Sequence, residues 1–257
     1  MRVIGSYLPP LMMVLILLGL WEAAILVYNI PPYVLPAPHL IAEAFWLHRT
    51  ELLAASVVTL TITFWAFIWA LLTGIGFAIV FTRARFIERA LYPYVVTLQV
   101  TPVIAIAPLI IIWVGFDQVQ RALVIIAWIV AFFPVLTNSV AGLRAVDPDL
   151  HDLFTLYRAR SWQRLVYLEL PAALPQILTG AKISASLALI GAVVAEFVAG
   201  SGNSTGLAWR IIESGNRLDI AAMFASLVLL SVIGIGLFYT LTLLEWLLLR
   251  RWHPSYR

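Results

Sequence analysis

The stretch DPDLHDLFTLYRARSWQRLVYLELPAALP, residues 147–175, is the one long polar segment in a chain otherwise rich in apolar runs. Its Asp-Pro-Asp opening is typical of a helix start, because proline fits the first turn and acids favour the positive end of the helix dipole. A helix is expected over 149–158, and its apolar residues share one face at spacings of three and four: Leu150, Leu153, Phe154 and Tyr157. A second short helix is expected from about Ser161 to Glu169, ending at Leu170-Pro171.

We refer to residues 147–175 as the docking segment. Two short amphipathic helices with a bend near 158–161 predict a projecting element that fits a groove on a soluble partner. Periodicity equally allows an amphipathic loop that lies on the membrane surface, so both interpretations stay open. The segment carries no paired nucleophile and base.

The remaining sequence has more apolar residues than one soluble core requires. Of 257 residues, 63% are hydrophobic and 11% are charged, which indicates a polytopic membrane protein. Backbone in lipid must satisfy its own hydrogen bonds, so we expect an all-α bundle of six transmembrane helices in a single domain, 1–257. The segments long enough to cross about 30 Å of hydrocarbon are about 8–28, 57–81, 91–114, 120–141, 177–198 and 220–249. The first of them is expected to be a retained helix, not a signal peptide.

The basic side chains predict how these helices are oriented. With the N-terminus inside, twelve of the 16 Lys and Arg residues fall on the cytoplasmic side, Lys182 at the inner end of the fifth span among them. The four outside are Arg49, Arg121, Arg210 and Arg217. Positive residues are enriched in cytoplasmic loops, so both termini and the docking segment are expected inside. The external segments are then 29–56, with a proline-rich turn and a short interfacial helix from about Pro38, and 199–219, with a second short helix.

Several classes of site have no support in the sequence. The net charge of +3 is too small to indicate nucleic acid, and zero cysteines exclude thiolate metal sites and disulfides. The four histidines lack ligand spacing, so no metal site is expected. The single lysine, Lys182, lies in Gly-Ala-Lys-Ile-Ser, which is not a phosphate-binding loop, so ATP hydrolysis would need another subunit.

Two spans carry unusual residues. The third contains Pro93, Pro102 and Pro108 and is expected to be kinked around Gln99, Thr101 and Pro102. Such a kink is tolerated where it faces a water-filled path, although prolines that only shape packing are the alternative. The fifth carries a stripe of small residues that allows another helix to approach closely: Gly180, Ser184, Ala188, Gly191 and Ala195. Near its outer boundary, Glu196 is either a functional acid or a merely hydrated or paired one.

The docking segment resembles the EAA loop of ABC importer permeases, in which Glu-Ala-Ala, three residues and Gly precede an apolar residue, any residue and Leu-Pro. The match places Asp152-Leu153-Phe154 at Glu-Ala-Ala, Arg158 at Gly and Leu170-Pro171 at the end. Residues 101–116 (TPVIAIAPLIIIWVGF) and 191–197 (GAVVAEF) resemble permeases of nitrate, sulfonate, taurine and pyrimidine-precursor importers. Arg158 departs from the pattern, since arginine tolerates left-handed backbone less well than glycine. Either the turn is built differently here, or Arg158 makes its own ion pair with the partner.

The resemblance implies a type I (MetI-like) importer in a bacterial inner membrane. It implies two permease copies, a homodimer by expectation, with two cytoplasmic ATPases that bind ATP and Mg²⁺ and an external solute-binding protein. The permease itself would hold no cofactor and no catalytic residue. Closure of the ATPase dimer would move the coupling helices of the docking segment and rock the bundles between inward and outward access.

The resemblance also implies three sets of site residues. The ATPase-docking set is Asp152, Phe154, Tyr157, Arg158, Ala159, Ser161, Trp162 and Gln163. The translocation-path set is Gln99, Thr101, Pro102, Asn138, Ser184 and Ser186, for which hydrogen bonding between helices is the alternative. The set that would meet the binding protein is Glu196, Arg210, Glu213 and Arg217.

An ion-coupled secondary transporter is the rival hypothesis. It would need ionisable residues inside the spans and inverted repeats. No repeat is evident, and the charged residues of the spans fall toward helix ends: Glu22, Lys182, Glu196 and Glu245. As substrate, the resemblance favours a pyrimidine- or riboflavin-like compound slightly over nitrate, sulfonate or taurine.

Overall fold

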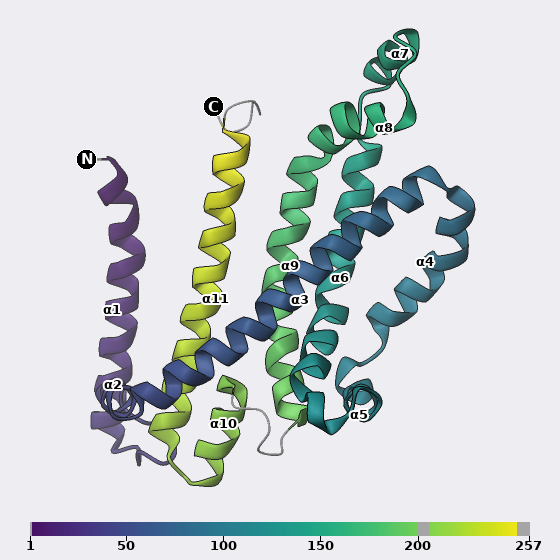
Figure 1. The fold of residues 1–257 in the computed structure, drawn as a ribbon. Helices are drawn as coiled ribbons and strands as arrows, with labels where there is room; N and C mark the ends of the chain where they lie inside the picture. Colours follow the sequence, from purple (N-terminus) through teal and green to yellow (C-terminus); the bar gives the residue numbers. More distant parts are fainter. Residues whose placement is uncertain (1, 200–205, 251–257) are drawn as a thin grey trace. The chain divides into compact units, whose positions relative to one another are not determined.

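The computed structural model describes residues 2–199 and 206–250, and every regular element in them is helical, as predicted (Figure 1). The elements are α1 (Arg2–Tyr28), α2 (Pro38–Leu47), α3 (Arg49–Arg83), α4 (Arg85–Val100), α5 (Val103–Val114), the 3₁₀ turn η1 (Phe116–Gln118), α6 (Val119–Arg144), α7 (Pro148–Leu156), α8 (Ser161–Arg164), the π turn η2 (Leu165–Glu169), α9 (Leu170–Ala199), α10 (Leu207–Asn216) and α11 (Ile220–Leu249). The predicted short helix from Pro38 is α2, and the one expected in 199–219 is α10.

Packing divides the described chain into two units. The first comprises residues 2–57 and 206–231, and the second comprises residues 58–199 and 232–250. The first unit contains α1, α2 and α10, the second contains α4 to α9, and α3 and α11 contribute residues to both. A single domain over the whole chain remains a prediction.

Four helical stretches are long and apolar enough to cross a membrane: Arg49–Arg83, Phe116–Arg144, Ser161–Ala199 and Ile220–Leu249. A fifth span results if α4 and α5 are counted together. The apolar part of α1, Met12–Tyr28, is shorter than these. Four of the six expected spans therefore have a helical counterpart of spanning length, or five if α4 and α5 form one span, and the span at the N-terminus stays a prediction.

The expected third span is broken between α4 and α5, which meet at a bend of 104°. The break falls at Thr101 and Pro102, where the kink was predicted, although α4 already begins at Arg85 rather than at residue 91. Thr101 is extended, with φ −69° and ψ 128°. The ring of a proline disfavours helical backbone in the residue before it, and this explains why the helix ends there.

The prediction that a helix stops at Leu170-Pro171 is wrong. Helical backbone runs without interruption from Ser161 to Ala199, through Pro171 and Pro175. The π turn η2 lies directly before Pro171, and in it the Leu170 N–H donates to the Leu165 carbonyl, five residues back. This wider turn moves the preceding carbonyls away from the proline ring, so the chain bends instead of ending its helix.

In the second unit, α6 and α9 run side by side (Figure 1) and approach each other closely. All five residues of the predicted small stripe on α9 are buried. A Cβ added to Gly180 would lie 2.8 Å from the Pro134 carbonyl oxygen, and one added to Gly191 would lie 2.8 Å from the Ala127 Cα. The prediction that the small stripe lets another helix approach closely is therefore confirmed, since only small residues allow this backbone contact.

An apolar cluster joins α3, α6 and α9 near the docking segment. Its buried members are Ala78, Phe81, Phe132, Leu136, Leu143, Ala173 and Ile177. Leu165 and Leu170 of the η2 region pack against it. The base of the docking segment is thus fixed to three helices by apolar contacts.

Candidate functional site

The docking segment begins with α7, whose start lies where the sequence predicted it and is capped by Asp147. The Asp147 carboxylate accepts a hydrogen bond of 2.9 Å from the Asp149 N–H, and proline occupies the first turn. The helix ends at Leu156, two residues earlier than expected. Its apolar side chains are only partly covered, with Leu153 44% and Tyr157 79% exposed.

The turn after α7 places Arg158 in left-handed backbone, with φ 52°. The Arg158 N–H donates to the Thr155 carbonyl (2.9 Å), and the Ala159 N–H donates to the Phe154 carbonyl (3.0 Å). These two bonds form a Schellman motif, which most often has glycine at this position. Arg158 therefore adopts the backbone conformation that glycine usually has in this turn, and the turn itself is not built differently. Within the described residues Arg158 forms no ion pair, and an ion pair with a partner protein remains a prediction.

We predict that Arg158→Gly stabilises the permease by up to about 1 kcal/mol, because glycine tolerates left-handed backbone that is unfavourable for arginine. The measurement is thermal unfolding of the purified permease in detergent, with an expected rise of about 2–4 °C. Arg160→Gly is the matched control, since Arg160 is also exposed but has φ −69°. A melting temperature that falls, or that rises equally in the control, would contradict the prediction.

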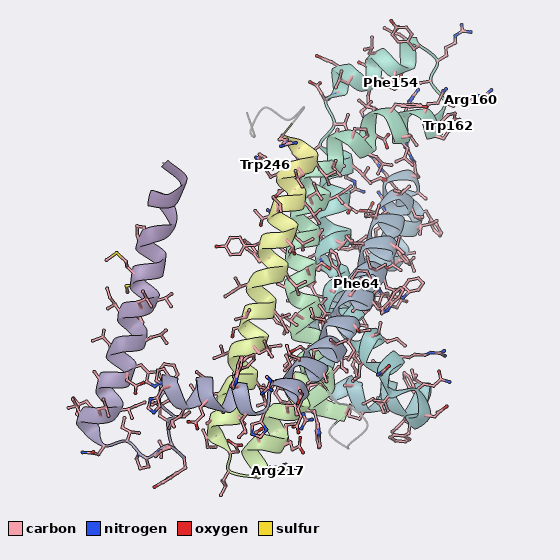
Figure 2. All side chains as sticks on the ribbon, turned by 60° about the vertical axis from the view of Figure 1, so that its left-hand side comes forward. Phe64, Phe154, Arg160, Trp162, Arg217 and Trp246 are labelled. Atoms are coloured by element: carbon pink, nitrogen blue, oxygen red, sulfur yellow. The ribbon has the colours of Figure 1, made fainter. Side chains whose placement is uncertain are left out.

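The second short helix, α8, is stabilised at its start by Gln163, whose Oε1 accepts a 2.7 Å hydrogen bond from the Arg160 N–H. Trp162 is 53% exposed and packs at a tilt against Tyr167, with 6.2 Å between the ring centroids. Figure 2 shows Phe154, Arg160 and Trp162 at the same end of the second unit. Between the two helices lies an open groove of about 450 Å³, lined by Leu153, Phe154, Tyr157, Ala159, Gln163 and Tyr167.

The groove gathers four of the eight residues predicted to meet an ATPase: Phe154, Tyr157, Ala159 and Gln163. Asp152, Arg158, Ser161 and Trp162 are exposed beside it. Tyr167 was not predicted, although it follows Gln163 by four residues and so shares its helical face. All eight residues lie in one continuous stretch of surface helices, but their contact with another protein remains a prediction.

Two of the predicted path residues hydrogen-bond within the helix pair. The Ser184 hydroxyl is fully buried and donates to the Ala131 carbonyl of α6 (2.8 Å). The Asn138 amide donates to the Pro134 carbonyl (2.8 Å) and lies where a Cβ on Gly180 would be. The Ser184 bond joins two helices and so favours the alternative of hydrogen bonding between helices, whereas the Asn138 bond lies within α6, so a place for Asn138 along the path stays a prediction.

The other four path residues lie on more exposed parts of the same unit. The Thr101 hydroxyl donates to the Thr97 carbonyl (2.7 Å), and the Ser186 hydroxyl donates to the Lys182 carbonyl (3.4 Å). Gln99 and Pro102 are exposed at the α4–α5 break. Their place along a path remains a prediction.

Glu196 is fully buried on α9. Its Oε1 accepts a 2.8 Å hydrogen bond from the Thr59 hydroxyl of α3. An acid in this position joins two helices, which favours the paired alternative, and a direct contact with a binding protein would require its exposure.

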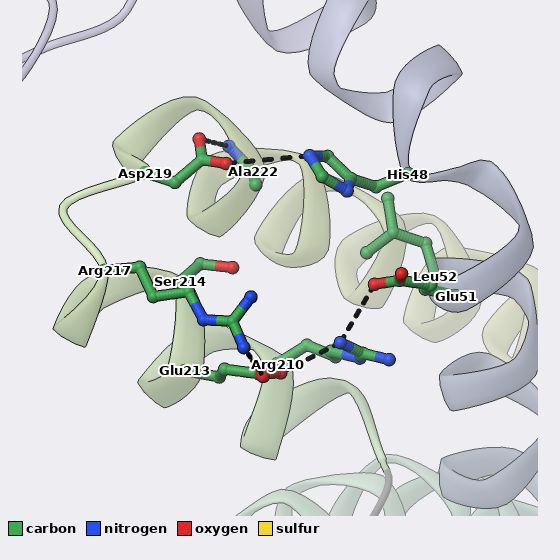
Figure 3. Close-up of a pocket in the computed structure, with 9 residues that line it drawn as sticks. All are labelled: His48, Glu51, Leu52, Arg210, Glu213, Ser214, Arg217, Asp219 and Ala222. Carbon is green, nitrogen blue, oxygen red and sulfur yellow. Dashed lines mark hydrogen bonds and ion pairs between the residues drawn. The ribbon is translucent and has the colours of Figure 1, made fainter.

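The other three residues predicted to lie outside form one charged cluster in the first unit (Figure 3). Arg210 Nη1 lies 3.0 Å from Glu51 Oε2 and 2.9 Å from Glu213 Oε2, and Arg217 Nη2 lies 2.7 Å from Glu213 Oε1. Sequence spacing alone predicts the pairs within α10, whereas Glu51 is distant in sequence and was missed. The cavity beside the cluster has about 40 Å³, which suits water better than a solute.

Three ion pairs bind helices of the second unit together. Lys182 Nζ lies 2.5 Å from Glu245 Oε2, joining α9 to α11. Arg83 pairs with Glu169, and Arg144 pairs with Glu88, each at 2.6 Å. The helical stretch that carries Lys182 runs from Ser161 to Ala199 and so extends beyond the predicted span 177–198, and the place of Lys182 at the inner end of that span stays a prediction.

The chain is similar in sequence to known permeases. The riboflavin transport system permease protein RibX of Chloroflexus aurantiacus is 34% identical over 243 residues, which cover 94% of this chain and 88% of RibX. The formylaminopyrimidine transport permease protein ThiX of Halalkalibacterium halodurans is 30% identical over 243 residues, covering 94% and 95%. The taurine transport system permease protein TauC of Escherichia coli is 27% identical over 233 residues, covering 85% and 80%.

The fold is also similar to a chain in the crystal structure of an amino acid ABC transporter with histidines. The TM-score is 0.63 at 19% sequence identity, covering 81% of this chain and 97% of the other. Residues 70–252 match the family described as binding-protein-dependent transport system inner membrane component. The chain belongs to this family and is the inner-membrane permease subunit of an ABC importer, a system that implies an ATPase and a solute-binding protein as partners.

Proposed function

We propose that this permease works as a type I importer with six spans and both termini in the cytoplasm, paired with a second identical copy. In this assembly the docking segment binds a cytoplasmic ATPase dimer, which holds ATP and Mg²⁺. An external binding protein delivers the solute to a path formed by the two copies. The observation that carries the proposal is the uncovered apolar surface of the docking segment.

The shape of that surface favours a protein partner over a membrane surface. The apolar side chains of α7 do not stand alone on its surface, because Leu153, Phe154 and Tyr157 line one groove together with Gln163 of α8 and Tyr167 of η2. A flat lipid interface needs apolar side chains on a common face. A groove edged by exposed aromatic side chains instead fits the anchors of a protein interface.

For the solute, we propose a small heterocyclic compound of the riboflavin or pyrimidine-precursor type. RibX and ThiX, whose printed solutes belong to this type, are 34% and 30% identical to this chain along most of its length. Taurine and sulfonates are the alternative, since TauC and the aliphatic sulfonate permease SsuC of Escherichia coli are each 27% identical. Transport into proteoliposomes would be compared for riboflavin, formylaminopyrimidine and taurine, each with its own binding protein.

The docking proposal predicts that replacing Tyr157 and Trp162 together by alanine weakens ATPase binding about 30-fold or more. A hot-spot residue of a protein interface costs about 2 kcal/mol or more when it is truncated, which is about 30-fold in affinity, and the expected loss requires at least one of the two aromatic residues to be a hot spot. The measurement is copurification of the candidate ATPase with the permease, followed by a binding titration in detergent. Trp46→Ala is the matched control, because Trp46 is 68% exposed but lies on α2, in a segment proposed to be external. Equal binding by wild type and the double variant would contradict docking at this surface.

A further inference from the structure

Arg83 contacts both ends of the helical stretch that follows the bend of the docking segment. It is the last residue of α3, and its Nη2 lies 2.6 Å from Glu169 Oε2. The same nitrogen donates to the Ser161 carbonyl oxygen at 3.4 Å. Ser161 begins α8 and Glu169 ends η2. One side chain of α3 therefore holds residues 161–169 at their start and at their end.

The burial of the Glu169 carboxylate strengthens its ion pair with Arg83. The Glu169 side chain is only 7% exposed, while that of Arg83 is 37% exposed. An enclosed carboxylate that loses its cation is left with an uncompensated charge, which is strongly unfavourable. Salt also screens an enclosed pair less than a surface pair. Movement of residues 161–169 away from α3 is therefore opposed by the pair, although solvent at the exposed part of Arg83 screens some of the attraction.

The π turn accounts for the direction of Glu169. In an α-helix each residue turns the side-chain direction by about 100°, so a one-residue insertion offsets the faces before and after it by that angle. The insertion η2 lies between α8, which carries Trp162, and α9. Because of this offset, the exposed Trp162 of α8 and the Glu169 side chain, which pairs with Arg83 of α3, point in different directions. Turns of this kind are frequent at functional sites.

Arg83 lies close in sequence to the apolar cluster that joins α3, α6 and α9. Phe81, two residues before Arg83, is fully buried in the cluster with Leu143 of α6 and Ile177 of α9. Displacement of α8 reaches α9 directly, because the two are parts of one helical stretch. It reaches α3 through a second connection, the Arg83–Glu169 pair.

We propose that Arg83 is a positioning residue that transmits displacement of the docking segment to α3 through Glu169, so that ATP-driven movement reaches two spanning helices. This inference rests on the proposed function, since the ATPase must bind the docking segment. The pair belongs to the protomer itself, and neither of its two residues lines the groove.

The test uses the complete transporter, with its ATPase and binding protein, in proteoliposomes. Arg83→Gln and Glu169→Gln each remove the ion pair while keeping a polar side chain of similar length. We expect solute transported per ATP hydrolysed to fall about tenfold, in the usual range of coupling between sites, with ATPase copurification retained. The charge-exchanged double variant Arg83→Glu with Glu169→Arg should recover most of this ratio.

Glu88→Gln is the matched control, because it removes a pair of the same 2.6 Å length between α4 and α6 that does not contact residues 161–169. An equal fall in the control, or an unchanged ratio in Arg83→Gln, would overturn the positioning role. Loss of copurification in Arg83→Gln alone would overturn it too, because the pair would then only shape the docking surface. Failure of the wild type to copurify with its ATPase would instead remove the proposed function.

Discussion

Gly191→Leu is expected to destabilise the permease by about 3 kcal/mol or more, at or above the upper end of the usual range for overpacking. A Cβ at this position would lie 2.8 Å from the Ala127 Cα and 3.3 Å from the Val130 Cβ. The first obstacle is backbone, which cannot change rotamer, so α6 and α9 must separate along their shared face. Separation would also strain the Ser184–Ala131 hydrogen bond between the same helices.

The measurement is the yield of monodisperse permease after membrane extraction, together with its melting temperature in detergent. Gly76→Leu is the control, because Gly76 lies in α3 with nothing within 4 Å of an added Cβ. This control should remain close to wild type. Similar losses in both variants would mean that glycine-to-leucine replacement itself, and not the contact of α6 with α9, is responsible.

The small stripe on α9 was predictable because its chemistry is local. Gly180, Ser184 and Gly191 recur at helical spacing, and in a membrane helix small residues at that spacing typically form the contact with another closely packed helix. The break at Thr101-Pro102 was predictable for the same reason, since a proline restricts its own neighbours. The partner helix, α6, carries no equally clear pattern and could not be named from the sequence.

The course of the chain through Pro171 was not predictable from local rules. Proline normally ends a helix, and it does not do so here because η2 inserts a residue just before it. The ion pairs were missed for a different reason. Glu169 and Arg83 are 86 residues apart in sequence, and only the packing of α3 against α9 brings them together. Arg158 was partly predictable. The sequence shows that it replaces the family glycine, but it does not show that Arg158 adopts the left-handed backbone of that glycine.

The second large effect is expected at Lys182, the single lysine of the chain, whose replacement by methionine should destabilise the permease by about 3–5 kcal/mol. Lys182 Nζ lies 2.5 Å from Glu245 Oε2, and the Glu245 side chain is 6% exposed. Removal of the ammonium leaves this carboxylate buried without a cation. Glu245→Leu should cost less, because the Lys182 side chain is 25% exposed and its long stem allows the charge to reach a more polar region.

The double variant Lys182→Met with Glu245→Leu separates the cost of an orphaned charge from the value of the pair. Both groups are then apolar and similar in volume to the originals, and such replacements of buried pairs are often neutral or stabilising. We therefore expect the double variant to melt close to wild type, whereas Lys182→Met alone should melt on the order of 10 °C lower. Losses that simply add in the double variant would mean that the two residues act independently. Recovery in the double variant would instead show that α9 and α11 need matched side chains at this contact, and that the charges themselves contribute little to stability.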